Sequence, residues 1–443
     1  MNNNTDTYPS FRTANTTLII LFAIYVLSFV DRQILSLMVG PIRETFGISD
    51  FQFSILYGSA FAITYAIAGL PLGRLADQFS RKHIIAGSVA FWSVATCMCG
   101  LAKSFPSLFI SRMMVGVGEG GFAPGAYSLV SDSYRPKHLG FAMAFLKSGV
   151  YVGSAVSLVL GGVLIEYFTS QEDLRFPLFG SLAPWQATFI TVGAPGVLLA
   201  LVMLLVREPV RRDMVVTADG NTRLPLRKVL GFLWVRKRTY LCLFVGSSML
   251  SMASYGGTAW YPEFFIRTYG VSRTEAGGLY GSLLFICGLS GIFLGPVLAR
   301  VLAKKHTDFY LRTILYASIV AAVPAVLAPL AGSKTLTLVL LVPALTFGSM
   351  YLGIMAASFQ PITPNQMRGQ MTAFYIFLTN IFGLAVGTSV MAAFTDFLFK
   401  DDSMLLYSIA TANALFYPLA IGLFAYGLKA YRASMEEAGN WTL

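Results

Sequence analysis

Five ionisable side chains lie deep inside otherwise apolar stretches of the sequence, away from the ends of these stretches: Asp31, Arg32, Arg112, Glu119 and Lys147. An uncompensated charge costs several kcal/mol in hydrocarbon, so such residues are kept for pairing or for function. Arg112 and Glu119 are seven residues apart, which places them on one face of a helix and about 10 Å apart along its axis. These residue types predict a buried polar site that binds charge or moves protons.

The depths of these residues indicate how they could pair. At about 1.5 Å per residue, Asp31 and Arg32 come out near the depth of Arg112, and Glu119 near that of Lys147, so two ion pairs between helices are geometrically open. The formal sum is one positive charge, which favours a carboxylate or phosphate ligand on Arg32, Arg112 or Lys147. Glu119 is the expected proton carrier and Asp31 its coupled partner; permanent structural ion pairs are the alternative.

Apolar stretches must position these residues. The chain has 443 residues, of which 56% are hydrophobic and 12% charged, more apolar surface than a soluble core can hide. About a dozen stretches reach the roughly 20 residues needed to cross a bilayer. Their approximate bounds are 16–40, 52–76, 84–103, 106–133, 138–168, 184–206, 240–266, 274–303, 309–332, 335–363, 368–398 and 403–431.

Six stretches, a basic segment and six more stretches predict a duplicated architecture. We expect an all-α membrane protein with twelve transmembrane helices in two six-helix bundles, 1–206 and 240–443, joined by a cytoplasmic linker at 207–239. The first apolar stretch is long and carries Asp31 and Arg32, so we do not expect a cleaved secretory signal. The substrate would bind between the bundles, near the middle of the membrane.

The formal charge of +11 is explained by topology. Placing both termini in the cytoplasm puts 22 of the 32 Lys and Arg residues on that side, as the positive-inside rule requires. The linker is the largest single contributor to this bias, and binding of anionic lipid by the linker is the alternative interpretation. Compact loops favour a bacterial inner membrane. Because the charge follows topology, we expect no nucleic-acid partner.

Several function classes lack the residues that they need. The four cysteines all lie inside apolar stretches, so no disulfide is expected, and the three histidines are too few for a His-rich metal site. No Gly-Lys dipeptide occurs, hence no P-loop for a nucleotide. We expect no enzyme activity, cofactor or metal; the expected partners are a small-molecule or lipid substrate, protons and membrane lipids, and the chain is expected to be monomeric. A receptor that binds without transport remains the rival class.

The segment GRLADQFSRK, residues 73–82, is the most specific motif. Asp77 at the end of one helix could meet the positive N-terminus of the helix that begins near Arg368, while Arg81 and Lys82 anchor the inner face. This contact would close the cytoplasmic side, so Asp77, Arg81 and Arg368 are predicted gating residues. The segment resembles the signature loop of the major facilitator superfamily.

Hydroxyl, amide and aromatic side chains suit the neutral part of a ligand. The alternative is that they are interfacial anchors or core packing. The predicted substrate-binding residues of this kind are Tyr127, Tyr151, Tyr255, Trp260, Tyr375 and Asn380.

Four segments resemble the spinster family, and the resemblance runs through most of the chain. It implies proton-coupled transport of lysophospholipids or sphingoid phosphates, with the Asp31–Arg32 pair and the Arg112–Glu119 face as the residues carried over. The first two segments also look like the anion:cation symporter family, which imports hexuronates with protons; the third favours spinster. Lys147 departs from the family pattern. The segments are YVLSFVDRQILS, SRMMVGVGEGGFAPGAYSLVSD, GTAWYPEFFIRTYGVS and QPITPNQMRGQMTAFYIF.

Overall fold

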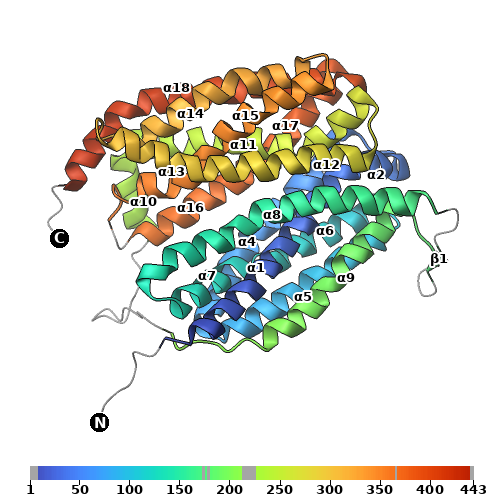
Figure 1. The fold of residues 1–443 in the computed structure, drawn as a ribbon, viewed down its shortest axis with the longest axis horizontal. Coiled ribbons are helices and arrows are strands. Elements are labelled where there is room, and N and C mark those ends of the chain that lie inside the picture. Colours follow the sequence, from blue (N-terminus) through green and yellow to red (C-terminus); the bar gives the residue numbers. More distant parts are fainter. Residues whose placement is uncertain (1–7, 172–174, 177–179, 212–225, 365–366, 440–443) are drawn as a thin grey trace, which may run out of the picture. The chain divides into compact units, whose positions relative to one another are not determined.

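The computed structural model describes residues 8–171, 175–176, 180–211, 226–364 and 367–439. Apart from β1 (Arg175–Phe176) and β2 (Gly180–Ser181), which pair antiparallel, its regular elements are helical (Figure 1). The predicted all-α class is therefore confirmed. In the predicted linker, Arg212 and Arg223 lie outside the described residues.

The first half of the chain forms the elements up to α9, and the second half forms the rest. The first set is α1 (Phe11–Gln33), η1 (Ile34–Leu37), α2 (Val39–Phe46), α3 (Asp50–Ser54), η2 (Ile55–Ser59), α4 (Ala60–Gln78), α5 (Arg81–Gly100), α6 (Phe105–Glu119), α7 (Phe122–Ser133), α8 (Pro136–Thr169) and α9 (Pro184–Leu204). The second set is α10 (Leu226–Val235), α11 (Lys237–Tyr269), α12 (Arg273–Leu283), η3 (Leu284–Gly288), α13 (Leu289–Ala303), α14 (Phe309–Leu327), η4 (Ala328–Leu330), α15 (Lys334–Phe359), α16 (Arg368–Asn380), η6 (Ile381–Gly387), α17 (Thr388–Ala393), η7 (Phe394–Phe399), η8 (Asp402–Met404) and α18 (Leu405–Gly439).

Ten helical segments of the described chain are long and apolar enough to cross a membrane by length and composition. The two other predicted spans are helical too. The span predicted at 106–133 is divided at Gly120 and Gly121 into α6 and α7, and the span predicted at 240–266 lies within α11. The expected twelve-helix architecture is confirmed.

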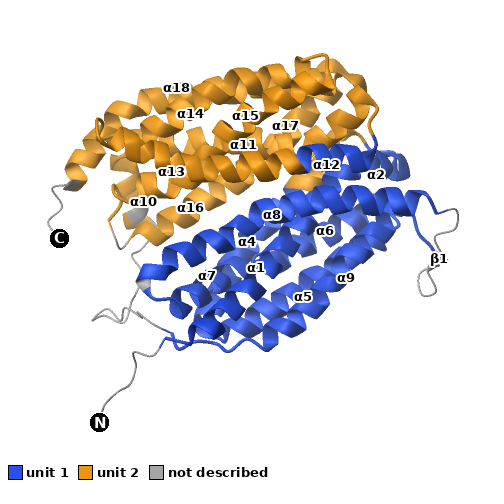
Figure 2. Cartoon of the chain, viewed as in Figure 1, with its two compact units in different colours: residues 1–48, 59–214, 272–281 blue, residues 49–58, 215–271, 282–443 orange. Residues whose placement is uncertain are grey.

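The chain forms two compact units (Figure 2). Unit 1 consists of residues 1–48, 59–214 and 272–281, and unit 2 of residues 49–58, 215–271 and 282–443. Most of each unit comes from one half of the sequence. The beginning of the second predicted span belongs to unit 2, however, and the beginning of the eighth to unit 1.

Small residues let two helices of unit 1 approach closely. α6 begins after a capping box at Ser104 and ends at Glu119, next to Gly120. A Cβ atom at Gly116 would lie 2.2 Å from Thr64 Oγ1 and 2.6 Å from the carbonyl oxygen of Phe61 on α4. Only glycine fits this crossing, which brings the end of α6 against α4.

A π-helical segment interrupts one long helix of unit 2. η6 separates α16 from α17, and its backbone has the wider i to i+5 hydrogen-bond pattern. Directly after it, the carbonyl of Thr388 accepts a hydrogen bond of 3.0 Å from Trp260 Nε1 on α11. The indole is 1% exposed, so this bond lies within the core of the unit.

Candidate functional site

Glu119 and Arg32 form a buried ion pair in unit 1. Arg32 donates from Nε over 2.7 Å and from Nη2 over 2.5 Å to Glu119 Oε2. Ser28, one helical turn before Arg32 on α1, donates to the same oxygen over 2.6 Å. The glutamate is 1% exposed. Three charge-assisted hydrogen bonds thus converge on one carboxylate oxygen.

Aromatic rings surround the guanidinium of Arg32. Its Cζ atom lies 4.8 Å from the ring centre of Phe29, 4.5 Å from that of Phe61 and 4.9 Å from that of Tyr65. The face of each aromatic ring attracts a cation, and this attraction is stronger where water is excluded. Arg32 is held by these rings and by Glu119, so its charge is already compensated within unit 1.

Asp31 and Arg112 lie beside this pair. Both are fully buried. Arg112 Nη1 donates over 3.2 Å to the backbone carbonyl of Asp31, and Thr96 Oγ1 donates over 3.3 Å to Asp31 Oδ2. The charges of Glu119 and Arg112 both act on the Asp31 carboxylate. The structure therefore brings together four of the five predicted membrane-depth residues, and their formal charges cancel.

Buried polar atoms without partners concentrate on the helices of this cluster. Within the described residues, six buried side-chain atoms have no hydrogen-bond partner. Five of these lie on α1, α5 or α6: Asp31 Oδ1, Trp92 Nε1, Ser93 Oγ, Arg112 Nε and Glu119 Oε1. Each such atom costs about 1–3 kcal/mol, which a purely structural core would avoid. Both carboxylates thus keep one oxygen available for a proton.

Lys147 lies apart from the charge cluster. It is exposed on α8, and it has no hydrogen bond or ion pair within the described part of the chain. Leu158, eleven residues farther along and therefore within about 20° of the same face, packs against Gly277 of α12. Exposed apolar residues such as Phe141 and Val163 lie on a different face. The ammonium group therefore does not share the apolar face that suits lipid.

Glu119 forms its ion pair with Arg32. The similar depths of Glu119 and Lys147 in the membrane had also predicted Lys147 as an alternative partner. The rise per residue places Cα atoms only. An arginine side chain extends several ångströms beyond its Cα, and here it lies along α1 toward the end of α6. Because its side chain is this long, Arg32 pairs with Glu119, although Glu119 lies two helical turns from Arg112, the residue at the depth of the Arg32 Cα atom.

Arg81 is the centre of a second buried network in unit 1. Its side chain is 1% exposed and pairs with Asp132 on α7 and with Glu208 after α9, the latter over 2.9 Å. Arg81 Nη2 also donates over 2.8 Å to the carbonyl of Pro209. Asp132 and Glu208 were not predicted to belong to this site; the only signal for them in the sequence is that both are acids at expected cytoplasmic helix ends. Arg81 therefore ties three segments of unit 1 together.

The two other predicted gating residues belong to different units. Asp77 lies in the last turn of α4, in unit 1, and Arg368 begins α16, in unit 2. Arg368 Nε donates to the carbonyls of Gln360 and Thr363, over 3.0 and 3.2 Å. A contact between Asp77 and the start of α16 stays a prediction.

The predicted aromatic and amide residues divide between the two units. In unit 2, Tyr375 is buried against Phe359, Tyr255 packs against Gly383, and Asn380 donates to the carbonyl of Ile376. Trp260 is fully buried, as described above. In unit 1, Tyr151 is buried on α8, four residues after Lys147, and Tyr127 is on α7 beside Tyr25. Their binding roles stay predictions.

A family comparison identifies this architecture. The model of the Major Facilitator Superfamily matches residues 21–388. The chain belongs to this superfamily. An MFS-type efflux pump of Mycolicibacterium smegmatis is 28% identical over 384 residues, covering 86% of this chain and 84% of that protein. A probable galactarate/D-glucarate transporter of Bacillus subtilis is 26% identical over 64% of each chain.

A solved structure extends the match to nearly the whole chain. It is a bacterial homologue of the human lysosomal transporter Spinster in an inward-facing, unoccupied conformation. It has a TM-score of 0.77 at 25% identity and covers 97% of this chain and 98% of that one. The superfamily and spinster resemblances are thus confirmed, and the protein is an integral, multi-pass membrane transporter.

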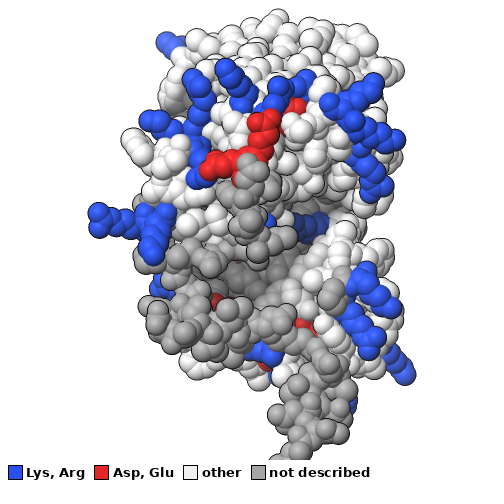
Figure 3. Space-filling view, turned by 90° about the vertical axis from the view of Figure 1, so that its left-hand side faces the viewer, with Lys and Arg blue, Asp and Glu red and all other residues white. Residues whose placement is uncertain are grey.

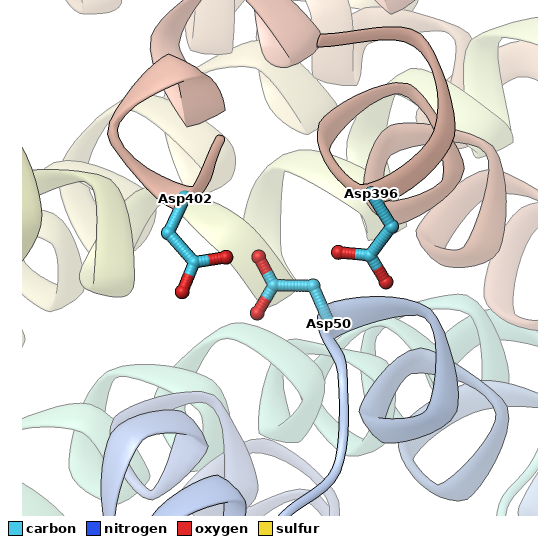
Figure 4. Close-up of side chains that lie close together, drawn as sticks. All are labelled: Asp50, Asp396 and Asp402. Carbon is cyan, nitrogen blue, oxygen red and sulfur yellow. The ribbon is translucent and has the colours of Figure 1, made fainter. Parts of the chain in front are cut away.

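Unit 2 of this superfamily member contains an acidic cluster that sequence analysis missed (Figure 4). Oxygen atoms of Asp50, Asp396 and Asp402 lie within 4.8 Å of one another. Arg267 donates to both oxygens of Asp50, over 2.7 and 2.8 Å, and to Glu263 over 2.8 Å. The backbone N–H of residue 51 donates to Asp396 over 2.7 Å. Protein groups therefore donate hydrogen bonds to the carboxylates of Asp50 and Asp396.

Each unit also has a carboxylate outside its membrane spans that arginine side chains bind: Glu208, which is partly buried, and Asp308, which is fully buried. Burial raises the pKa of Glu208, but hydrogen bonds from Ser80 and Arg81 outweigh it and lower the pKa below its ordinary 4.5. Burial likewise raises the pKa of Asp308, but hydrogen bonds from Arg312 and Arg432 lower it below 3.8. Arg312 Nε lies 2.9 Å from Asp308 Oδ1.

Acidification is expected to destabilise the transporter through these two carboxylates. A group whose folded pKa is lowered stabilises fully above its unfolded pKa, and this contribution is lost as the pH falls through the folded value. The midpoint of thermal unfolding in detergent should therefore be constant at pH values above about 5 and should decrease at lower pH. Asp308→Asn should lower the midpoint at pH 7 and flatten its decline in acid. An equally steep decline in this variant would contradict the assignment.

Proposed function

We propose that this chain is a proton-coupled transporter of an anionic amphipathic substrate, and that the acidic group of the substrate binds Lys147. The observation that carries the proposal is the distribution of charge in unit 1. Asp31, Glu119, Arg32 and Arg112 compensate one another within one buried cluster. Lys147 is exposed and has no carboxylate partner in the described chain, so among the five charged residues at membrane depth it is the cation that a substrate anion can neutralise.

The proton would be carried by Glu119, with Asp31 as its coupled partner. Both are fully or almost fully buried, and each keeps one oxygen without a hydrogen-bond partner among the described residues. Protonation of Glu119 would weaken its bond to Arg32 and thereby link proton uptake to a change in unit 1.

The amphipathic class rests on the spinster resemblance, which implies lysophospholipids or sphingoid phosphates. The solved Spinster homologue matches nearly the entire chain, which supports this choice. A second candidate is a small organic anion such as a sugar acid. Relatives named as transporters of galactarate, D-glucarate and D-galactonate favour it, and a lone lysine would bind either class.

The proposed location is a bacterial inner membrane, with both termini cytoplasmic and the chain monomeric. Within each unit, Lys and Arg side chains gather on the face shown in Figure 3. This bias is typical of the cytoplasmic side. The predicted lock between Asp77 and the helix that begins at Arg368, with Arg81 as its anchor, would close that side during alternating access.

Replacing Lys147 with methionine tests the proposed anion site, because methionine keeps the length and removes the charge. Binding of lysophosphatidate should weaken about 10-fold to 100-fold, the value of one charge-assisted contact. Monoacylglycerol, the same molecule without its phosphate, should bind unchanged. Calorimetry with both ligands measures the difference.

The matched control is Lys147→Arg, which keeps the positive charge and should keep most of the preference for phosphate. If Lys147→Met weakened the binding of lysophosphatidate and of monoacylglycerol equally, Lys147 would have a packing role, and this result would contradict the proposal. Glucarate that binds wild type and is weakened by Lys147→Met, with no binding of lysophosphatidate, would select the sugar-acid candidate.

A further inference from the structure

A groove in unit 1 lies between α1 and the end of α9, away from the cluster around Glu119. Its volume is ≈ 340 Å³. Arg12, in the first turn of α1, and Arg207, three residues after α9, both line it. Thr16, Ile20 and Leu205 supply a hydroxyl and an apolar wall. The groove therefore combines two cations with a hydrophobic side.

The two arginines of the groove differ from Arg81 and Arg312 in their partners. In the part of the chain that the structure describes, neither Arg12 nor Arg207 has an ion-pair partner, whereas Arg81 and Arg312 bind carboxylates. Both are exposed. Two guanidinium groups at one groove present paired N–H donors, the arrangement that binds phosphate oxygens most strongly.

The apolar side of the groove continues onto surface that suits hydrocarbon. Both α1 and α9 belong to segments long and apolar enough to cross the membrane. Ile19 on α1 and Leu198, Leu201 and Leu205 on or after α9 are large, exposed hydrophobic side chains. An occupant must therefore present an anion to the arginines and an apolar chain to this surface.

We propose that this groove binds the phosphate of an anionic membrane phospholipid in the leaflet on the Lys- and Arg-rich side. Phosphate oxygens accept hydrogen bonds from Arg12 and Arg207, and an acyl chain lies along Ile20 and Leu205. The lipid would link the beginning of α1 to the end of α9. This site is separate from the proposed substrate site, and its test requires no transport.

Thermal unfolding of the purified protein in detergent tests the site. Phosphatidylglycerol should raise the midpoint of wild type more than phosphatidylcholine with the same acyl chains, because a ligand that binds the folded state stabilises it. The phosphatidylglycerol excess is the additional rise in the midpoint over that given by phosphatidylcholine. In Arg12→Gln/Arg207→Gln this excess should disappear, and the apparent affinity for phosphatidylglycerol should be weaker by about tenfold or more. Native mass spectrometry should show the corresponding loss of bound lipid.

The matched control is Lys137→Gln/Lys304→Gln, which removes the same charge from exposed positions outside the groove. It should keep the phosphatidylglycerol excess. An equal excess in the arginine double variant would overturn the proposal, as would its loss in the lysine control. If inorganic phosphate gave the same stabilisation as phosphatidylglycerol, the groove would be a free-anion site and not a lipid site.

Discussion

Replacing Glu119 with glutamine is expected to abolish pH-driven accumulation of substrate while leaving substrate exchange across the membrane intact. The glutamine keeps an oxygen that can accept from Arg32 and Ser28, but it cannot take up or release a proton. For each coupled proton, one pH unit supplies about 1.4 kcal/mol, a tenfold concentration ratio. Proteoliposomes with and without an imposed pH gradient measure this ratio, and counterflow measures exchange.

Glu119→Asp is the matched control, because it keeps a titratable carboxyl group. It should retain part of the accumulation. If Glu119→Gln still accumulates substrate in response to the gradient, Glu119 is not the coupling residue and Asp31 takes its place. Loss of both accumulation and counterflow would instead show that Glu119 is needed for the folded site.

Replacing Arg267 with alanine is expected to give the largest loss of stability. The change leaves Asp50, fully buried, without its bidentate partner and removes the cation from Glu263. Removing one member of a buried ion pair costs about 3–5 kcal/mol. The thermal midpoint in detergent should fall by several degrees.

A double variant separates two effects on stability: the loss of the ion pair, and the cost of leaving the Asp50 carboxylate buried without a partner. In Arg267→Ala/Asp50→Asn the unpaired carboxylate is gone, so the double variant should be more stable than Arg267→Ala alone. Arg300→Ala, at an exposed position in α13, should leave the midpoint within experimental error. A small effect of Arg267→Ala would show that solvent or the remaining backbone contacts already compensate Asp50.

The sequence was sufficient to predict the helices and the buried polar cluster. Hydrocarbon requires long apolar segments and penalises unpaired charge, so both features are strong local signals. Asp31, Arg32, Arg112 and Glu119 could be selected on this ground alone. Their detailed pairing could not, because helix rise gives the height of a Cα atom but not the direction of a long side chain.

The Arg267 cluster was missed for a different reason. Asp50 and Asp402 lie just outside predicted spans, where a single charge is ordinary, and 135 residues separate Arg267 from Asp402. Their proximity depends on packing within unit 2, to which residues 49–58 belong. Glu263 and Arg267 are four residues apart on α11, so their ion pair was the only contact of this cluster that sequence spacing could predict.

The π-helical segment η6 sets the angular phase between two parts of one helix. A π turn holds more residues than an α turn, so Ile381–Gly387 accommodates about one residue more than regular α-helix would for the same rotation. Suppose that all seven of these residues closed into regular α-helix. Everything after it would then rotate by about 100° about the helix axis. The Thr388 carbonyl would turn away from Trp260, although no side chain had been changed. The π geometry of this segment therefore keeps the faces of α16 and α17 in register.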